Sequence, residues 1–176
     1  MGPFRQAIIE ELEISEDLQS WLVGSVSLGG LVGSLLAGKL ADIIGRKLST
    51  VIYFSVSTVG WLMVALAYNS EMVFCGRIIH GLGEGMALAI SVIYVGEIIE
   101  ENYRGAAIVS LTVSSCLGTS TAYVLGVRLT WRVSYGLGPV IGLASIVCLV
   151  AVPESSIWEA QKNEEDIHEK LNSAKK

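Results

Sequence analysis

Charged residues are scarce in this chain of 176 residues. Asp, Glu, Lys and Arg together make up 16% of the sequence, whereas soluble domains contain about 25%. Apolar residues, by contrast, occur in long blocks with almost no charge inside them. This composition excludes an ordinary soluble domain and favours a protein that crosses a membrane several times.

Cysteine and histidine are also few. The three cysteines, Cys75, Cys116 and Cys148, lie far apart in apolar blocks, so neither a disulfide framework nor a cysteine metal site is predicted. His80 and His168 are isolated, and no nucleophile–base pair or phosphate-binding loop has a usable spacing. We therefore expect no enzyme, no catalytic residue, no metal site and no cofactor.

The apolar blocks predict five membrane-spanning helices. Each block is long enough to cross about 30 Å of hydrocarbon at about 1.5 Å per residue. The expected fold class is all-α: a polytopic transmembrane bundle over residues 18–152, between a polar extracellular segment, 1–17, and a cytoplasmic helical tail, 153–176. The blocks are Leu18–Gly38, Leu48–Ser70, Met72–Gly96, Gly105–Val127 and Val133–Pro153.

The charges outside these blocks predict the orientation. Acidic residues near the two ends account for the net charge of −5 and give no sign of a nucleic-acid partner. Five spans place eight of the twelve basic residues on one side: Lys39, Arg46, Lys47, Arg104, Lys162, Lys170, Lys175 and Lys176. Because cytoplasmic loops are enriched in Lys and Arg, we expect residues 38–47 and the C-terminal tail in the cytoplasm, the N-terminus outside, and the plasma membrane as the location.

The third block is the least ordinary, because three ionisable residues interrupt it. Arg77, His80 and Glu84 follow the spacing i, i+3 and i+7, which places them on one face of a helix. Charge at mid-membrane depth is unfavourable unless it faces a cavity or a partner. Two interpretations stay open. Arg77 and Glu84 neutralise each other or a neighbouring helix, or they line a polar pathway for substrate or protons.

Small residues recur at every fourth position in several blocks. Such ladders let helices approach closely, because packing rather than a hydrophobic driving force holds helices together in lipid. The sequence therefore predicts close helix contacts along four ladders. They are Gly29–Gly33–Ala37–Ala41, Gly30–Ser34–Gly38, Gly81–Gly85–Ala89 and Ser110–Ser114–Gly118–Ala122–Gly126.

A short polar stretch, Gly38–Lys47, separates the first two blocks, and we expect it to form a tight charged turn. Its spacing resembles the loop between the second and third helices of major facilitator superfamily transporters: Gly38-x-x-x-Asp42-x-x-Gly45-Arg46-Lys47. Later stretches are similar to motifs of the sugar porters in that superfamily: Gly76-Arg77-x-x-x-Gly81-x-x-x-Gly85, Tyr94-Val95-Gly96-Glu97, Arg104-Gly105 and Pro153-Glu154-Ser155-Ser156-Ile157-Trp158. Val92 and Ser156 stand where the family pattern has proline, and Thr112 stands where many sugar porters have a sugar-binding glutamine.

The resemblance implies that the chain corresponds to helices two to six of a twelve-helix carrier in the lipid bilayer. It implies alternating-access transport of a hexose or a disaccharide, and it leaves facilitative and proton-coupled transport open. It also implies a cytoplasmic gate closed by carboxylate–guanidinium pairs. The implied gating residues are Gly38, Asp42, Gly45, Arg46, Lys47, Glu97, Arg104 and Glu154. The candidate substrate pathway consists of Arg77, Glu84 and Thr112.

A second hypothesis comes from another class of protein. The matched motifs cover less than half of such a carrier, and Glu84 stands in a region where small residues are expected. A truncated membrane protein that does not transport, or an interaction partner of a full-length transporter, would also fit these observations.

Overall fold

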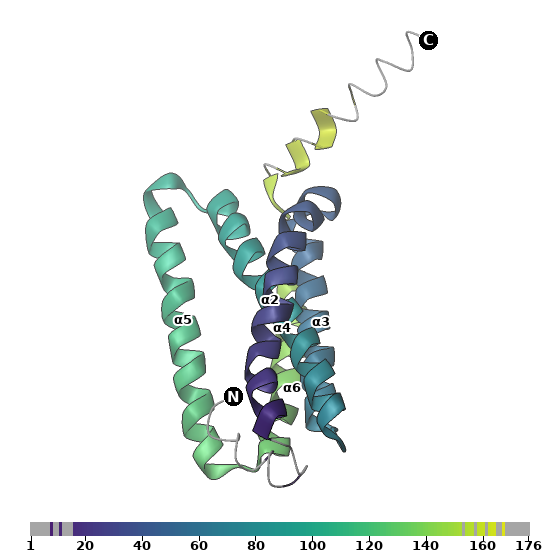
Figure 1. The fold of residues 1–176 in the computed structure, drawn as a ribbon. Helices are drawn as coiled ribbons and strands as arrows, with labels where there is room; N and C mark the ends of the chain where they lie inside the picture. Colours follow the sequence, from purple (N-terminus) through teal and green to yellow (C-terminus); the bar gives the residue numbers. More distant parts are fainter. Residues whose placement is uncertain are drawn as a thin grey trace, which may run out of the picture.

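The computed structural model describes most of the chain: Ile8, Glu11, residues 16–152, and residues 154–156, 158–160, 162–164 and 167 of the tail. Within these residues it has five helices that are long and apolar enough to cross a membrane, which confirms the predicted all-α polytopic fold (Figure 1). The helices are α2 (Glu16–Ile44), α3 (Arg46–Ala65), α4 (Ser70–Ile98), α5 (Glu101–Arg128) and α6 (Trp131–Val150).

The two predicted outer segments, 1–17 and 153–176, fall mostly outside the described residues, as does His168. The boundaries of these segments therefore stay predictions. The described pieces of the tail lie at the same end of the bundle as the link between α2 and α3 (Figure 1).

The charged stretch 38–47 is mostly helix, so the predicted turn is wrong in its extent. α2 continues through Gly38 and Asp42 to Ile44, and α3 begins at Arg46. Gly45 alone separates the two helices, with φ 94° and ψ 159°, a region that is essentially open only to glycine. A helix satisfies its own backbone hydrogen bonds whatever its side chains are, so polar residues extend α2 beyond its apolar part. The onset of charge therefore does not mark the end of this helix.

Glycines bring α4 into close contact with α2. A Cβ atom on Gly29 or Gly33 would collide with the backbone of α4, and one on Gly81 or Gly85 would collide with the backbone of α2. The structure thus confirms the predicted packing role of these four glycines. Gly38 is different, because a Cβ atom there would have no neighbour within 4 Å.

α3 lies against both α4 and α6. Gly60 of α3 packs against the backbone of α4 at His80, and Gly138 of α6 packs against the Trp61 ring of α3. Asn69 sets the start of α4, because its side chain accepts a hydrogen bond of 2.9 Å from the Met72 N–H and caps the helix. Together, α2, α3, α4 and α6 form the packed part of the molecule.

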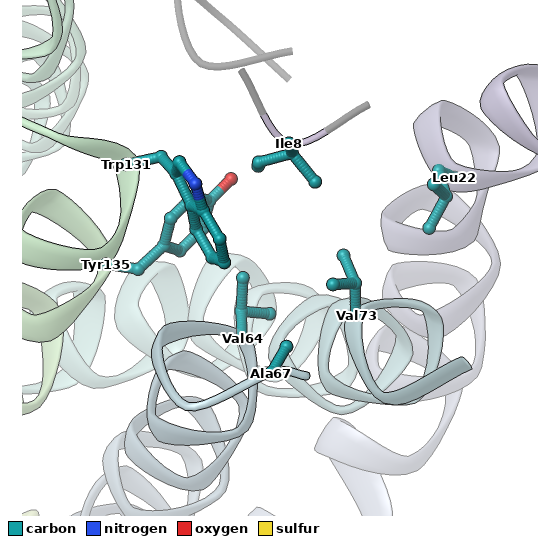
Figure 2. Packing of buried hydrophobic residues seen from close by; sticks show 7 residues of the cluster. All are labelled: Ile8, Leu22, Val64, Ala67, Val73, Trp131 and Tyr135. Carbon is teal, nitrogen blue, oxygen red and sulfur yellow. The ribbon is translucent and has the colours of Figure 1, made fainter. Parts of the chain in front are cut away.

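A hydrophobic cluster lies at the end of the bundle that is remote from Gly45, and Figure 2 shows its side chains. Side chains from the start of α2, the end of α3, the link between α3 and α4, the start of α4 and the start of α6 meet there with one residue of the N-terminal segment. The cluster consists of Ile8, Leu22, Val64, Ala67, Val73, Trp131 and Tyr135. A second cluster lies nearer to Gly45, where Ala37 and Ala41 of α2 face Tyr53 of α3 and Met86 and Ile90 of α4.

α5 stands apart from the other helices (Figure 1). None of its residues from Glu101 to Arg128 is buried, and a Cβ atom on Gly118 would meet no atom within 4 Å. The small-residue ladder predicted from Ser110 to Gly126 therefore makes no close helix contact within the described part of the chain.

Candidate gating site at the ends of α2, α3 and α6

Arg46, the first residue of α3, is the centre of a charged cluster. The residue is only 6% exposed. Its Nε and Nη2 atoms donate to the Glu97 carboxylate of α4 at 3.0–3.2 Å. Its Nη1 atom donates to the Ala41 carbonyl oxygen at 2.9 Å and lies 3.1 Å from Asp42 Oδ1. Because a guanidinium holds several acceptors in one plane, Arg46 joins the end of α2 to the end of α4.

The two carboxylates beside Arg46 differ in exposure. The side chain of Glu97 is 15% exposed, whereas that of Asp42 is 72% exposed. An exposed ion pair contributes little to stability, but a buried carboxylate that loses its partner is strongly unfavourable. The pair between Arg46 and Glu97 is therefore the one that holds this end of the bundle together.

Gly45 leaves room for Glu154. A Cβ atom at Gly45 would lie 2.8 Å from Glu154 Oε2, and glycine has no side chain to cap α3. The first N–H groups of a helix lack acceptors within the helix, and here Glu154 Oε1 accepts from Lys47 N at 2.9 Å and from Ser155 N at 3.0 Å. The carboxylate also faces the positive end of the helix dipole. Glu154 thus caps the N-terminus of α3.

Lys47 makes the reciprocal contact. Its Nζ atom donates at 3.2 Å to the carbonyl oxygen of Val150, the last residue of α6. The last carbonyl groups of a helix lack donors within the helix and attract cations. α3 and α6 therefore cap each other, since Glu154 follows α6 in the chain and Lys47 belongs to α3.

Two tail residues complete the arrangement. Ser155 is fully buried and donates through Oγ to Glu97, and Trp158 Nε1 donates to the Asp42 carbonyl oxygen at 2.9 Å. Sequence reasoning did not select either residue, although both belong to the Pro153–Trp158 motif. We call the assembled residues the helix-end cluster: Asp42, Gly45, Arg46, Lys47, Glu97, Glu154, Ser155 and Trp158.

Two of the predicted gating residues lie outside the helix-end cluster. Arg104 donates to the Ile99 carbonyl oxygen at 3.1 Å and pairs with Glu101 at 3.6 Å. Gly38 lies on α2 with open space beside it. The structure therefore brings together the other six predicted gating residues; a gating role for any of them remains a proposal.

The predicted pathway residues are not assembled into one site. Arg77 is 8% exposed; its guanidinium carbon lies 5.5 Å from the centre of the Tyr135 ring, and its Nε and Nη2 atoms have no hydrogen-bond partner among the described residues. Glu84 is exposed and forms no ion pair with Arg77. Of the two interpretations, mutual neutralisation is thus not seen in the structure.

Thr112 lies on α5 and donates to the Ile108 carbonyl oxygen of its own helix at 3.5 Å. An open groove of about 480 Å³ runs between α3, α4, α5 and α6, and its hydroxyl-bearing residues are Thr50, Tyr53, Ser91, Tyr94 and Ser145. None of the three predicted pathway residues lines this groove.

At the opposite end of the bundle, Glu11 is bound to the start of α6. Its carboxylate accepts from Arg132 Nε at 3.1 Å, from Arg132 Nη2 at 2.9 Å, and from Trp131 Nε1. The Arg132 guanidinium, followed by the Trp131 indole N–H, holds the pKa of Glu11 below its ordinary value.

Comparison with known protein families gives a match over nearly the whole chain. Residues 5–175 match the family described as "Sugar (and other) transporter". The chain belongs to this sugar transporter family. It is 32% identical over 154 residues to the sugar transporter ERD6 of Arabidopsis thaliana, covering 88% of this chain and 31% of that relative. It is 29% identical over 161 residues to a facilitated trehalose transporter Tret1-2 homolog of Drosophila sechellia, covering 90% and 32%.

Solved transporters share the fold. A partially occluded inward-open structure of the xylose transporter XylE from E. coli matches with a TM-score of 0.81 and 19% identity, over 94% of this chain and 46% of that one. Its inward-open structure matches with a TM-score of 0.71 and 21% identity, over 96% and 48%. The predicted major facilitator resemblance is confirmed, and the chain is a multi-pass membrane protein. It spans about a third of the length of the curated relatives it matches.

Proposed function

We propose that this sugar transporter family member moves a sugar across the membrane by alternating access, in which groups of helices rock about a central site and contacts between helix ends break and form again. The relatives that support this are named as transporters of sugars, among them trehalose. A hexose or a disaccharide is the proposed substrate, and the process involves no covalent chemistry.

The observation on which the proposal rests is the helix-end cluster. At one end of the bundle, charge-assisted hydrogen bonds join Arg46 of α3 to Glu97 of α4, and Glu154 accepts one from the first turn of α3. Such bonds are strong while they are shielded, yet they can be exchanged for bonds to water when the helix ends separate. This is what a gate between two states requires, because each state needs contacts that the other lacks.

We place the helix-end cluster at the cytoplasmic surface of the plasma membrane. The support is the distribution of basic residues, eight of twelve on that side. The N-terminal segment is then outside. Proton coupling belongs to the same proposal, because α4 has Arg77, His80 and Glu84 inside a membrane-spanning helix, where ionisable residues mark pathways for substrate or protons.

The test is uptake of labelled glucose and trehalose into proteoliposomes. Two preparations are compared: this chain alone, and the product of the complete reading frame that contains it. Saturable uptake that unlabelled sugar competes away is expected from the second preparation. If neither preparation shows saturable uptake of any hexose or disaccharide, the proposed function is wrong.

A second candidate function is binding to a full-length relative without transport. The observation that favours it is α5, a transmembrane helix without a buried residue. Co-purification of this chain with a tagged full-length carrier, together with absent uptake in both preparations, would select this candidate.

A further inference from the structure

Of the five described membrane-spanning helices, one carries acidic or basic side chains in its central part. α4 contains Arg77, His80 and Glu84, whereas the stretches 20–38 of α2, 48–65 of α3, 105–127 of α5 and 133–150 of α6 contain no Asp, Glu, Lys, Arg or His. The titratable groups of those four stretches are phenols and thiols, from Tyr53, Cys116, Tyr123, Tyr135 and Cys148. Among the described residues, these four stretches therefore offer no cation to the Glu84 carboxylate, which lies at the same depth on α4.

Two of these three residues, Arg77 and His80, are enclosed by neighbours. The Arg77 guanidinium lies beside the Tyr135 ring of α6. The His80 Nδ1 atom lies 3.0 Å from Ser57 Oγ of α3, and its ring centre lies 4.7 Å from that of Trp61. Both side chains are thus held within the packed part of the bundle.

Glu84 is different from both. It is the middle residue of the 29-residue helix α4, it is exposed, and it has no hydrogen bond or ion pair among the described residues. Its neighbours Gly83 and Gly85 pack against the backbones of α3 and α2. The carboxylate therefore lies on a part of α4 that neither of these helices covers.

Physical chemistry limits what such a carboxylate can do. An ionised carboxylate at mid-membrane depth is stable only in contact with water or a cation, whereas the neutral acid is far less unfavourable in an apolar setting. Each time a transport cycle closes this face of α4 from water, either the charge must be neutralised or the closure must stop.

We propose that Glu84 is the proton-binding group of this carrier, an inference that rests on the proposed transport function. While its face of α4 is open to water on one side, a carboxylate oxygen takes a proton from water and an O–H bond forms. The neutral side chain then permits closure. After reopening to the other side, the O–H bond breaks and the same proton returns to water there, so one proton crosses per cycle with the sugar.

The first experiment compares Glu84→Gln with the unchanged protein in proteoliposomes made from the complete reading frame. Glutamine keeps the size of the side chain and cannot take up the proton. Glu71→Gln is the matched control, because Glu71 is an exposed carboxylate in the first turn of the same helix. An inward proton gradient is expected to drive sugar accumulation in the unchanged protein and in Glu71→Gln. In Glu84→Gln, sugar should still cross the membrane, but its concentrations on the two sides should only become equal.

The outcomes separate this inference from the proposed function. Accumulation by Glu84→Gln equal to that of the unchanged protein would overturn the inference. If sugar exchange by the unchanged protein does not respond to the proton gradient, the inference is also overturned, but the transport function is not. Glu84→Asp should regain part of the coupling, because it restores a carboxylic acid.

A second measurement does not depend on sugar transport. Infrared difference spectra of the protein in lipid, taken between high and low pH, should show the carbonyl band of a protonated carboxylic acid. All carboxylates contribute to this band when they become protonated, so the variants are compared with one another. Glu84→Gln should remove the component of a carboxylic acid in an apolar setting, and Glu71→Gln should keep that component. If uptake is never seen but this component assigns to Glu84, the transport function fails and the proton site remains; a component that persists in Glu84→Gln refutes the site.

Discussion

Arg46 and Arg104 both belong to motifs of the sugar transporter family, yet their surroundings differ. Arg46 is enclosed at a junction of helices and bound to a carboxylate 51 residues away. Arg104 is held only by groups within its own turn, from Ile99 to Glu101. The motif identifies both arginines, but only the folded chain shows which one joins separate helices.

This contrast predicts different costs for the same substitution. Arg46→Gln should lower the free energy of unfolding by about 3 kcal/mol, because Glu97 would remain buried without a cation. Arg104→Gln should lower it by no more than about 1 kcal/mol, because its ion pair is exposed. Chemical unfolding in detergent micelles measures both. Equal losses in the two variants would contradict the proposed importance of the buried pair.

Gly45 and Gly38 provide a second matched pair. Gly45→Ala should destabilise the protein by about 1–3 kcal/mol, because φ 94° is unfavourable for any other residue and because the new methyl group would press on Glu154. Gly38→Ala should stabilise α2 by about 0.5–1 kcal/mol, because alanine is the better helix former and open space surrounds that position. Thermal unfolding of the two variants should shift in opposite directions; shifts of the same sign would count against this account.

At the scale of helices, the apolar blocks locate the spans well but not their ends. The block Met72–Gly96 differs from α4 by two residues at each end, because Asn69 supplies a cap close to where the apolar residues begin. α2 extends six residues beyond the block that ends at Gly38, since hydropathy reports the thickness of the hydrocarbon and not the end of a hydrogen-bonded helix. Ser155 and Trp158 escaped prediction because their partners lie on other helices.

The glycine contacts between α2 and α4 give a third prediction. Gly85→Ala should destabilise the protein by about 1–3 kcal/mol, because the added methyl group would collide with the backbone of α2. Gly118→Ala on α5 is the control, since open space surrounds that position, and it should be neutral or slightly stabilising. Thermal unfolding in lipid nanodiscs measures the difference. A loss of stability in Gly118→Ala as large as that in Gly85→Ala would show that α5 packs closely against another helix in the lipid.

The contact between Glu11 and α6 gives a prediction about pH. Because the folded state lowers the pKa of Glu11, its stabilising contribution is complete above the ordinary glutamate value of about 4.3. It is lost as the pH falls through the lower folded-state value. Glu11→Gln should therefore lower the unfolding temperature at neutral pH and flatten its fall in acid. If the substitution leaves the dependence of the unfolding temperature on acidic pH unchanged, this contact does not contribute to stability.

At the scale of the whole molecule, the proposed orientation can be tested by chemical labelling. Tyr68 lies exposed in the link between α3 and α4, and Ser156 lies exposed beside the helix-end cluster. In a background with the three native cysteines replaced by serine, a membrane-impermeant thiol reagent added to intact cells should label Tyr68→Cys. It should label Ser156→Cys only after the cells are permeabilised. The reverse pattern would place the helix-end cluster outside the cell.

The mutual capping of α3 and α6 has a consequence for the kinetics of opening. Lys47 and Glu154 each satisfy the end of the other's helix, so pulling the two helices apart removes both caps in one movement. The freed N–H and C=O groups must then find water together. Partial separation keeps neither cap and gains little solvation, so intermediate states are unfavourable. The closed arrangement should therefore persist behind a single barrier and open as a two-state switch, with few partly open molecules at any moment.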